Sequence, residues 1–167
     1  MYLLDVNVVS ELRKPPHRLN PGVAHWARAN VGRSAGGTAA FISVIGLIEI
    51  ERGVRLMERR DPRQGQNLRR WLDGEVRPNF DGALLPVTEA IAKKAAAYQV
   101  PDPRPLADSL MAATAAIHGL TLVTRNTVDF ATFDVALINP FTGEPSPEAR
   151  RSKRFDVEEV AGGGVGV

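Results

Sequence analysis

The chain has 167 residues, 44% of them hydrophobic and 24% charged, which is ordinary for one globular domain with its own core. It contains no cysteine, which excludes disulfides, thiolate nucleophiles and zinc fingers, and its three histidines form no ligand pair. With 21 basic and 19 acidic residues, the net charge of +2 is too small to indicate nucleic-acid binding by itself. The N-terminal stretch lacks the basic leader of a secretory signal, and no apolar run approaches the ~20 residues of a membrane span. We therefore expect a soluble, cytoplasmic protein.

The first half of the chain predicts short strands that lead into helices. An apolar strand over residues 2–4 ends at Asp5, and Asn7 is expected to cap the helix that follows. A Gly-Gly pair at 36–37 marks a loop, and Asp-Pro at 61–62 divides a long helical stretch into a hairpin. The elements expected in this half are strands over residues 2–4 and 40–43, and helices over residues 8–12, 23–30, 44–59 and 64–73.

The second half repeats this alternation. Thr88 and Glu89 open an alanine-rich helix, three prolines between 101 and 105 form a loop, and Gly119 ends the next helix. The expected elements are strands over residues 83–87, 120–124 and 135–138, and helices over residues 89–99 and 106–118. Short apolar strands that alternate with helices indicate an α/β fold with a mainly parallel sheet of four to five strands.

The composition changes after about Thr142, which divides the chain into a folded domain (1–142) and a polar tail (143–167). We interpret the tail as mobile and its charged run as solvated. The alternative is that the basic RRSKR sequence within it, residues 150–154, contacts nucleic acid or a partner.

Four acidic residues in distant segments are candidates for a common site. In open parallel sheets the site lies outside the carboxyl ends of the strands, where we place Asp5 and the segment that contains Asp129. Glu49 and Asp108 lie on helices expected to begin on the same side. Carboxylate oxygens suit hard divalent cations such as Mg²⁺, and one or two such ions can activate water for phosphodiester hydrolysis.

Each acid also has a purely structural interpretation. Asp5 could cap a helix or interact with its dipole, and Asp108 stands in a first helical turn, where acids are common. Asn126 and Asp129 imitate a capping box. Glu49 lies in a helix with apolar residues on nearly every side, where an unpaired acid is costly. Glycines 46 and 53 share its face and suggest either a ligand's close approach or tight helix packing with Glu49 reaching the rim.

Four ordered segments resemble PIN-domain ribonucleases, most closely the VapC- and FitB-type toxins of type II toxin–antitoxin pairs. The segments are LLDVNVVSEL, ISVIGLIEIERGV, LADSLMAATAAIHGLTLVTRN and the following VDF. The resemblance spans residues 1–141 and implies a three-layer PIN-like fold. A lone D-x-N would be weak support, whereas four motifs in order are specific.

The resemblance implies a role for each matching residue. Asp5, Glu49 and Asp108 would be the first, second and third metal-binding acids, and Asp129 the fourth, often acting through water. The polar residues expected to support them are Asn7, Ser10, Thr124 and Asn126. It further implies Mg²⁺ or Mn²⁺, hydrolysis of RNA by metal-activated water, homodimers or larger toxin–antitoxin assemblies, and a small antitoxin partner. Gly46 departs from the family, because many relatives have threonine there, and the tail matches nothing assignable.

Arginines 52, 55 and 59 recur at helical spacing on the predicted helix that carries Glu49. One interpretation is contact with RNA phosphates or with an antitoxin. The other is a solvated face whose arginines pair with Glu51, Glu58 or Asp61. Tryptophans 26 and 71 are expected in the core or an interface rather than as platforms for base stacking.

Other functions fit the sequence less well. An aspartate after the first strand can be a phosphatase nucleophile or a receiver phosphorylation site. A haloacid-dehalogenase-like phosphatase would have an acid where Asn7 stands, and a receiver would have a lysine where Thr124 and Arg125 stand. A PIN-like module that binds RNA or a partner without catalysis is the remaining alternative, although no predicted acid is missing.

Overall fold

The computed structural model describes residues 1–31 and 39–142 and contains one five-stranded sheet. All pairs of neighbouring strands are parallel, in the order β3-β2-β1-β4-β5. The strands are β1 (Tyr2–Leu4), β2 (Ala40–Ser43), β3 (Leu84–Leu85), β4 (Thr121–Val123) and β5 (Leu137–Ile138). The predicted α/β fold with a parallel sheet is therefore confirmed.

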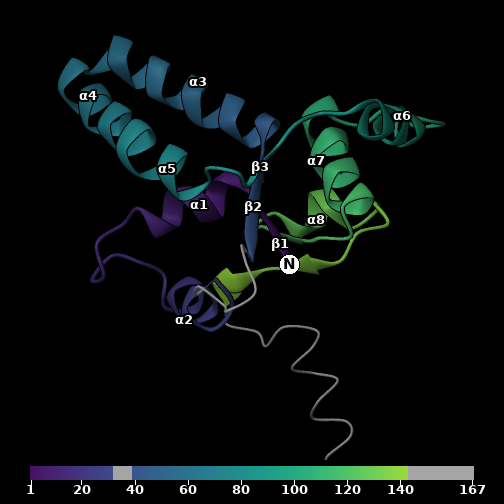
Figure 1. Cartoon of the computed structure of the whole chain (residues 1–167), viewed down its shortest axis with the longest axis horizontal. Helices are drawn as coiled ribbons and strands as arrows, with labels where there is room; N and C mark the ends of the chain where they lie inside the picture. The colour runs from purple at the N-terminus through teal and green to yellow at the C-terminus, as the bar shows by residue number, and fades with distance from the viewer. Residues whose placement is uncertain (32–38, 143–167) are drawn as a thin grey trace, which may run out of the picture.

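Helices connect the strands and flank the sheet (Figure 1). They are α1 (Val6–Leu12), α2 (Pro21–Asn30), α3 (Val44–Arg60), α4 (Pro62–Trp71), α5 (Arg77–Asn79), α6 (Glu89–Ala97), α7 (Leu106–Ile117) and α8 (Thr127–Phe130), with a π-helical turn at Leu72–Val76 and a 3₁₀ turn at Pro140–Thr142. Side-chain caps set several starts: Ser43 accepts a hydrogen bond from the Gly46 amide, and Asp61 accepts two from the first turn of α4. Gly119 follows α7 at φ +60°, as expected for a glycine that ends a helix.

The strands bury side chains on both faces of the sheet, which gives three layers. Tyr2 and Leu4 belong to a cluster formed with α1, α2 and α3, whereas Leu3 packs with α7 and α8 on the other face. Trp26 is buried in the first cluster with its ring edge-on to Tyr2, at 5.2 Å between centroids. Trp71 packs partly buried against the same cluster, so both tryptophans serve the core as expected.

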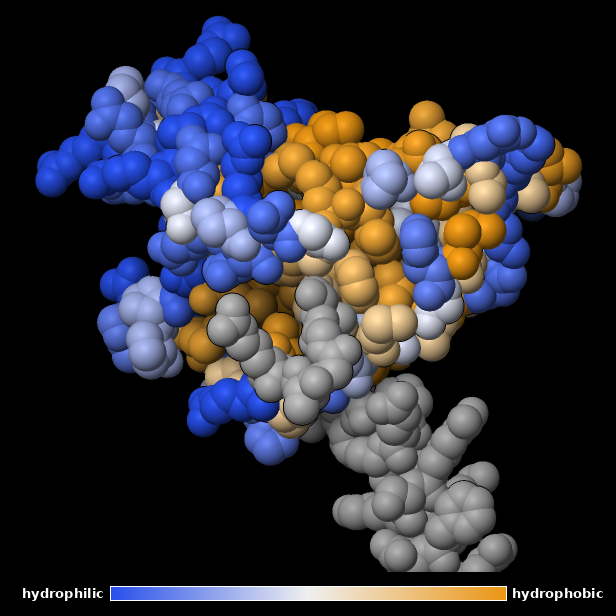
Figure 2. Space-filling model, viewed as in Figure 1, coloured by the Kyte–Doolittle hydropathy of each residue, from blue (hydrophilic) through white to orange (hydrophobic). Residues whose placement is uncertain are grey.

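The predicted helical hairpin is formed by α3 and α4, which lie side by side and carry a largely hydrophilic outer surface (Figures 1 and 2). A Cβ atom at Gly65 would lie 2.6 Å from the backbone nitrogen of Glu58, so only glycine allows the two helices to approach this closely. Arg69 of α4 bonds to both Glu51 and Glu58 of α3 across this contact. Close backbone packing and ion pairs together hold the hairpin.

Several boundaries differ from those predicted. Helix α1 begins at Val6, so Asn7 lies inside its first turn rather than capping it. β3 covers only 84–85, because Pro86 has no amide hydrogen for a further ladder bond. The short helix α8 was not predicted as a separate element.

The expected loop at 36–37 and the tail at 143–167 lie outside the described residues, so the division into domain and tail stays a prediction. Among the residues that are described, no helix is long and apolar enough to cross a membrane.

Candidate active site

A polar pocket of about 320 Å³ lies at the carboxyl end of β1. Its lining residues are Asp5, Val6, Asn7, Glu49, Ala107, Asp108, Met111, Asn126 and Phe130. Asp5 directly follows β1, Glu49 comes from the second turn of α3, and Asp108 from the first turn of α7. The structure thus brings three of the four predicted acids together from three distant segments.

Asp5 is held by two polar neighbours. The buried Thr124 hydroxyl donates to Asp5 Oδ2 at 2.5 Å, and the Asn7 amide donates to the same oxygen at 2.5 Å. Thr124 Oγ1 itself accepts from the Asn7 amide at 3.2 Å and from the Asn126 backbone at 3.0 Å, so its single proton is left for Asp5. No hydrogen bond within the described residues uses Asp5 Oδ1, which leaves that oxygen for a ligand.

Glu49 and Asp108 lack such support. Neither carboxylate forms a hydrogen bond or an ion pair with any residue that the structure describes. Desolvation raises the pKa of Glu49, the charges of Asp5 and Asp108 raise it further, and Arg52 opposes them. Desolvation likewise raises the pKa of Asp108, followed by the charges of Asp129 and Asp5. The pocket therefore concentrates negative charge that the surrounding side chains do not neutralise.

Asp129 lies beside this pocket rather than in its lining. Its exposed carboxylate accepts a hydrogen bond from the Asn126 side chain, and Asn126 does line the pocket. Asn126 makes no side-chain cap on α8, so the capping box that the sequence imitates does not form. Asp129 still contributes to the electrostatics, because its charge raises the pKa of Asp108.

The environment of Glu49 agrees only in part with expectation. Its side chain is exposed at the rim, as one alternative held, but neighbouring Ile48 is 60% exposed, so the helix is not surrounded by core as the apolar sequence suggested. A Cβ at Gly46 would meet Val6 at an ordinary 3.5 Å, and one at Gly53 would meet nothing within 4 Å among the described residues. Neither glycine is required by a close approach at this site.

Of the predicted supporting residues, Asn7, Thr124 and Asn126 form the network around Asp5. Ser10 lies one turn further along α1, is half-buried and does not line the pocket.

Glu11 and Arg125 were missed by the sequence analysis. Glu11 is only 4% exposed; it accepts from Lys14 Nζ at 2.7 Å and from the Asn20 amide at 3.0 Å. Burial raises the pKa of Glu11, but its bonds to Lys14 and Asn20 and the charge of Arg125 outweigh this, so the net pKa is lowered. The signal in the sequence was position: Glu11 lies four residues after Asn7 on one helix face, and Arg125 lies between Thr124 and Asn126.

The chemistry of the pocket suits a hard divalent cation. Its donors are carboxylate and amide oxygens, and the charges of its three acids are uncompensated. Within residues 1–31 and 39–142, however, no three acidic, histidine or cysteine side chains form a compact group able to hold an ion by themselves. This agrees with the behaviour of Mg²⁺, which commonly binds through one or two carboxylates and keeps several waters.

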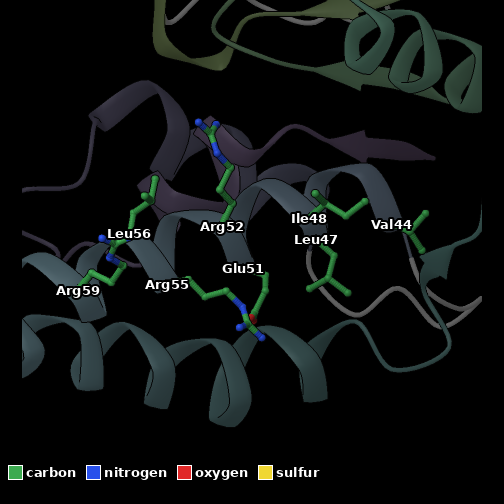
Figure 3. Close-up of a pocket in the computed structure, with 8 residues that line it drawn as sticks. All are labelled: Val44, Leu47, Ile48, Glu51, Arg52, Arg55, Leu56 and Arg59. Carbon is green, nitrogen blue, oxygen red and sulfur yellow. The ribbon is translucent and has the colours of Figure 1, made fainter.

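A second, larger concavity of about 640 Å³ follows the outer face of α3 (Figure 3). It is lined by Val44, Leu47, Ile48, Glu51, Arg52, Arg55, Leu56 and Arg59. Glu51 and Arg55 reach toward α4 while Arg52 points the other way. Figure 2 shows hydrophobic residues gathered between the α3–α4 hairpin and α7. We call this concavity the α3 groove.

The predicted arginines thus share one groove, but they are not equivalent. Arg55 pairs with Glu51 at 2.6 Å, and Glu51 also pairs with Arg69 at 2.7 Å, which confirms that Glu51 pairs with arginines. Arg52 and Arg59 are exposed and form no ion pair within the described part of the chain. The sole acid of the α3 groove lining is already neutralised, so the groove offers binding surface rather than catalytic groups.

Comparison with known proteins agrees with this arrangement. The model of the PIN domain family matches residues 2–135. Toxin FitB of Neisseria gonorrhoeae is 32% identical over 146 residues, covering 84% of this chain and 99% of that protein. Ribonuclease VapC14 of Mycobacterium tuberculosis is 48% identical over 75 residues, covering 45% of this chain and 66% of that protein.

The three-dimensional comparison gives the same result. The crystal structure of FitAcB from Neisseria gonorrhoeae superposes with a TM-score of 0.70 at 32% identity, covering 84% of this chain and 99% of that chain. The pocket at the end of β1, the parallel sheet and these similarities agree: the chain belongs to the PIN domain family, where it resembles the VapC ribonucleases and the FitB toxin.

Proposed function

We propose that this chain is a metal-dependent endoribonuclease and the toxin component of a type II toxin–antitoxin pair. The observation that carries the proposal is the pocket lined by Asp5, Glu49 and Asp108, in which neither Glu49 nor Asp108 forms an ion pair with any described residue. Keeping like charges together costs stability, which a bound cation would offset. The similarity to a ribonuclease and to a toxin supports RNA as the substrate.

The residues of the pocket have distinct proposed roles. Asp5, Glu49 and Asp108 would hold Mg²⁺ or Mn²⁺, with Asp129 acting at the edge through water. The bound cation would activate a water molecule and neutralise charge on the phosphodiester during hydrolysis. Thr124 and Asn7 fix the carboxylate of Asp5, and Asn126 does the same for Asp129.

We further propose that the α3 groove binds a macromolecular partner. Its exposed apolar residues Ile48 and Leu56 offer contact area, and Arg52 and Arg59 offer unpaired positive charge. A cognate antitoxin is the partner we favour, because the chain is similar to Toxin FitB and to a structure of FitAB bound to a DNA fragment. RNA backbone contact by the same arginines is the alternative, and a homodimer is the expected assembly of the chain itself.

Cleavage of RNA tests the catalytic proposal. Purified protein freed of any partner is incubated with total RNA and Mg²⁺ or Mn²⁺, in parallel with EDTA and with Asp5→Asn. Cleavage that disappears in both controls supports the proposal. Cleavage that survives both would exclude the carboxylate pocket as the active site.

A specific observation supports a second candidate, a non-catalytic module that binds RNA or a partner. The acids do not form a compact metal-holding group among the described residues. This candidate predicts RNA binding that is unaffected by EDTA, with no cleavage under any metal condition.

A further inference from the structure

We infer that Arg125 binds a backbone phosphate of the RNA strand, next to the carboxylate pocket. This inference rests on the proposed function, because it assumes an RNA substrate. Arg125 directly follows Thr124 at the end of β4, and β4 is the neighbour of β1 in the sheet. The other neighbour of β1 is β2, which leads into α3 and Arg52. Arg125 and Arg52 therefore lie in the segments that follow the two strands adjoining β1, at whose end Asp5 stands.

The backbone of Arg125 is anchored to the pocket. Its backbone amide donates to Asn7 Oδ1 at 3.0 Å, and the side-chain nitrogen of Asn7 donates to Asp5 Oδ2. Its carbonyl accepts from the Asn139 side chain at 3.1 Å. The residue is thus fixed at both peptide groups, at a constant position relative to Asp5.

The guanidinium group is oriented as well. It lies 4.0 Å from the ring centroid of Phe141, and one of its terminal nitrogens lies 3.5 Å from Glu11 Oε2. A stacked, paired arginine loses less conformational freedom on binding a phosphate than a freely rotating one. The side chain is nevertheless 58% exposed, so it remains accessible to a ligand.

The charge around Arg125 favours an anion. Glu11 already receives a hydrogen bond from Lys14 at 2.7 Å, so the cluster of Glu11, Lys14 and Arg125 has one excess positive charge. Among the described residues, Arg125 forms an ion pair only with Glu11, and this pair is longer, at 3.5 Å, than the pair of Glu11 with Lys14, at 2.7 Å. A guanidinium carries five N–H donors, so after its contact with Glu11 it still has a pair of N–H groups that can donate to two phosphate oxygens.

An RNA strand needs such a contact here. The pocket contains three acids, and their negative potential would repel the phosphates on either side of the one being cleaved. The positive charge of Arg125, whose amide bonds to Asn7 of the pocket lining, would offset this repulsion for one of those phosphates. The competing explanation is a positioning role. In that case the contacts of the Arg125 side chain with Phe141 and Glu11 would hold its backbone amide against Asn7, and the side chain would contact no substrate.

Direct RNA binding separates the two explanations without requiring cleavage. Affinity for a labelled single-stranded RNA is measured in EDTA at several salt concentrations, using the full chain with Asp108→Asn as the parent. Arg125→Ala should weaken binding several-fold and reduce the salt dependence by about one phosphate contact, a slope change of ~0.7. Arg125→Lys, which keeps the charge but loses the fork, should keep the slope and bind with intermediate affinity.

Arg77→Ala is the matched control, because Arg77 is 69% exposed and pairs with Asp73 at 3.6 Å but lies on α5. It should bind RNA like the parent. Three results would overturn the inference. They are an RNA affinity and salt dependence that Arg125→Ala leaves unchanged, a loss of RNA affinity in Arg77→Ala equal to that in Arg125→Ala, and no RNA binding by the parent. Loss of Mn²⁺ affinity when Arg125→Ala is introduced into the wild type, with RNA binding unchanged in the Asp108→Asn background, would establish the positioning role instead. RNA binding that depends on Arg125 without any cleavage by the wild type would overturn the nuclease proposal alone.

Discussion

The acids of the carboxylate pocket and those of the α3–α4 hairpin have opposite pKa shifts. In the hairpin, Glu51 bonds to Arg69 and Arg55, and these bonds lower the pKa of Glu51 to about 2. In the pocket, Glu49 and Asp108 have no such partners, and desolvation and neighbouring acids raise the pKa of each. Glu49 and Glu51 nevertheless lie only two positions apart along α3.

This difference separates acids that stabilise the fold from acids that oppose it. A lowered pKa means that the folded state favours the charged carboxylate, whereas a raised pKa means that it disfavours it. Unfavourable charge that the structure holds in one pocket is a signature of a functional site. The paired acids of the hairpin stabilise the fold, and the acids of the pocket are the ones at which we propose that a cation binds.

Neutralising a pocket acid should have the largest effect. Asp5→Asn or Asp108→Asn should lower RNA cleavage by at least about 100-fold, because each keeps the side-chain shape and removes ligand charge. The measurement is the initial rate of cleavage in Mn²⁺, with circular dichroism to verify folding. Glu51→Gln is the matched control on the hairpin and should keep the wild-type rate. Equal loss in the control, or full activity in both pocket variants, would contradict the distinction.

Removing the support of Asp5 should have the next largest effect. Thr124→Val keeps the shape but leaves Asp5 Oδ2 without the hydroxyl donor and the Asn126 amide without its acceptor. Loss of such an orienting contact costs about 10–100-fold in metal affinity or activity. Thr114→Val removes another fully buried threonine hydroxyl, which bonds to the Leu110 carbonyl within α7. It should lower the melting temperature without a comparable loss of activity; matching activity losses in the two variants would argue against a specific role for Thr124.

Breaking the hairpin pairs should affect stability rather than catalysis. Arg69→Met leaves Glu51 and Glu58 without their shared partner and should lower the melting temperature at pH 6. Glu51 has a folded-state pKa of about 2, below its ordinary value of 4.5. Its contribution to the stability of the folded state is therefore present above about pH 4.5 and is lost as the pH falls toward 2. The gap in melting temperature from the wild type should therefore narrow between pH 6 and pH 3. Arg63→Met, which removes an exposed arginine of α4, is the control and should leave the melting temperature nearly unchanged. If the difference in melting temperature between Arg69→Met and the wild type widened in acid, Glu51 would not be stabilised by its pairing with Arg69.

Alanine substitution at two glycines of the hairpin should change the free energy of unfolding in opposite directions. Gly65→Ala would place a methyl group 2.6 Å from the Glu58 backbone nitrogen and should cost about 1–3 kcal/mol. Gly53→Ala meets no described atom within 4 Å and should stabilise α3 by about 0.5–1 kcal/mol. Urea unfolding measures both free energies, and stabilisation by Gly65→Ala would show that the helices are not in backbone contact there.

The sequence predicted the elements that local patterns determine. The strand before Asp5, the helix that carries Glu49 and the Asp-Pro division of the hairpin all appear in the structure. The carboxyl ends of parallel strands also placed Asp5 correctly beside the acids of the following helices. These features depend on periodicity, caps and prolines, which are visible in a short window.

Contacts between side chains from distant segments were harder to predict from the sequence. Asn7 was expected to cap a helix, but its side chain holds Asp5 and the Arg125 backbone, a contact between residues 118 positions apart. The exposure of Ile48 and Glu49 was hidden, because an apolar residue in an outer groove and one in the core look alike in sequence. Glu11 and Arg125 were missed for the same reason: their pairing joins the ends of two distant elements.

The most direct test of the central claim is the melting temperature with and without Mn²⁺ for the wild type and Asp108→Asn. Asp108 has a raised folded-state pKa, so above that pKa its charge lowers stability, and the variant lacks this cost. We predict that in EDTA at pH 7 the variant melts at least as high as the wild type. Mn²⁺ should then raise the melting temperature of the wild type well above that of the variant. A variant that is less stable in EDTA, or that gains as much from Mn²⁺ as the wild type, would contradict the assignment of this pocket as a cation site.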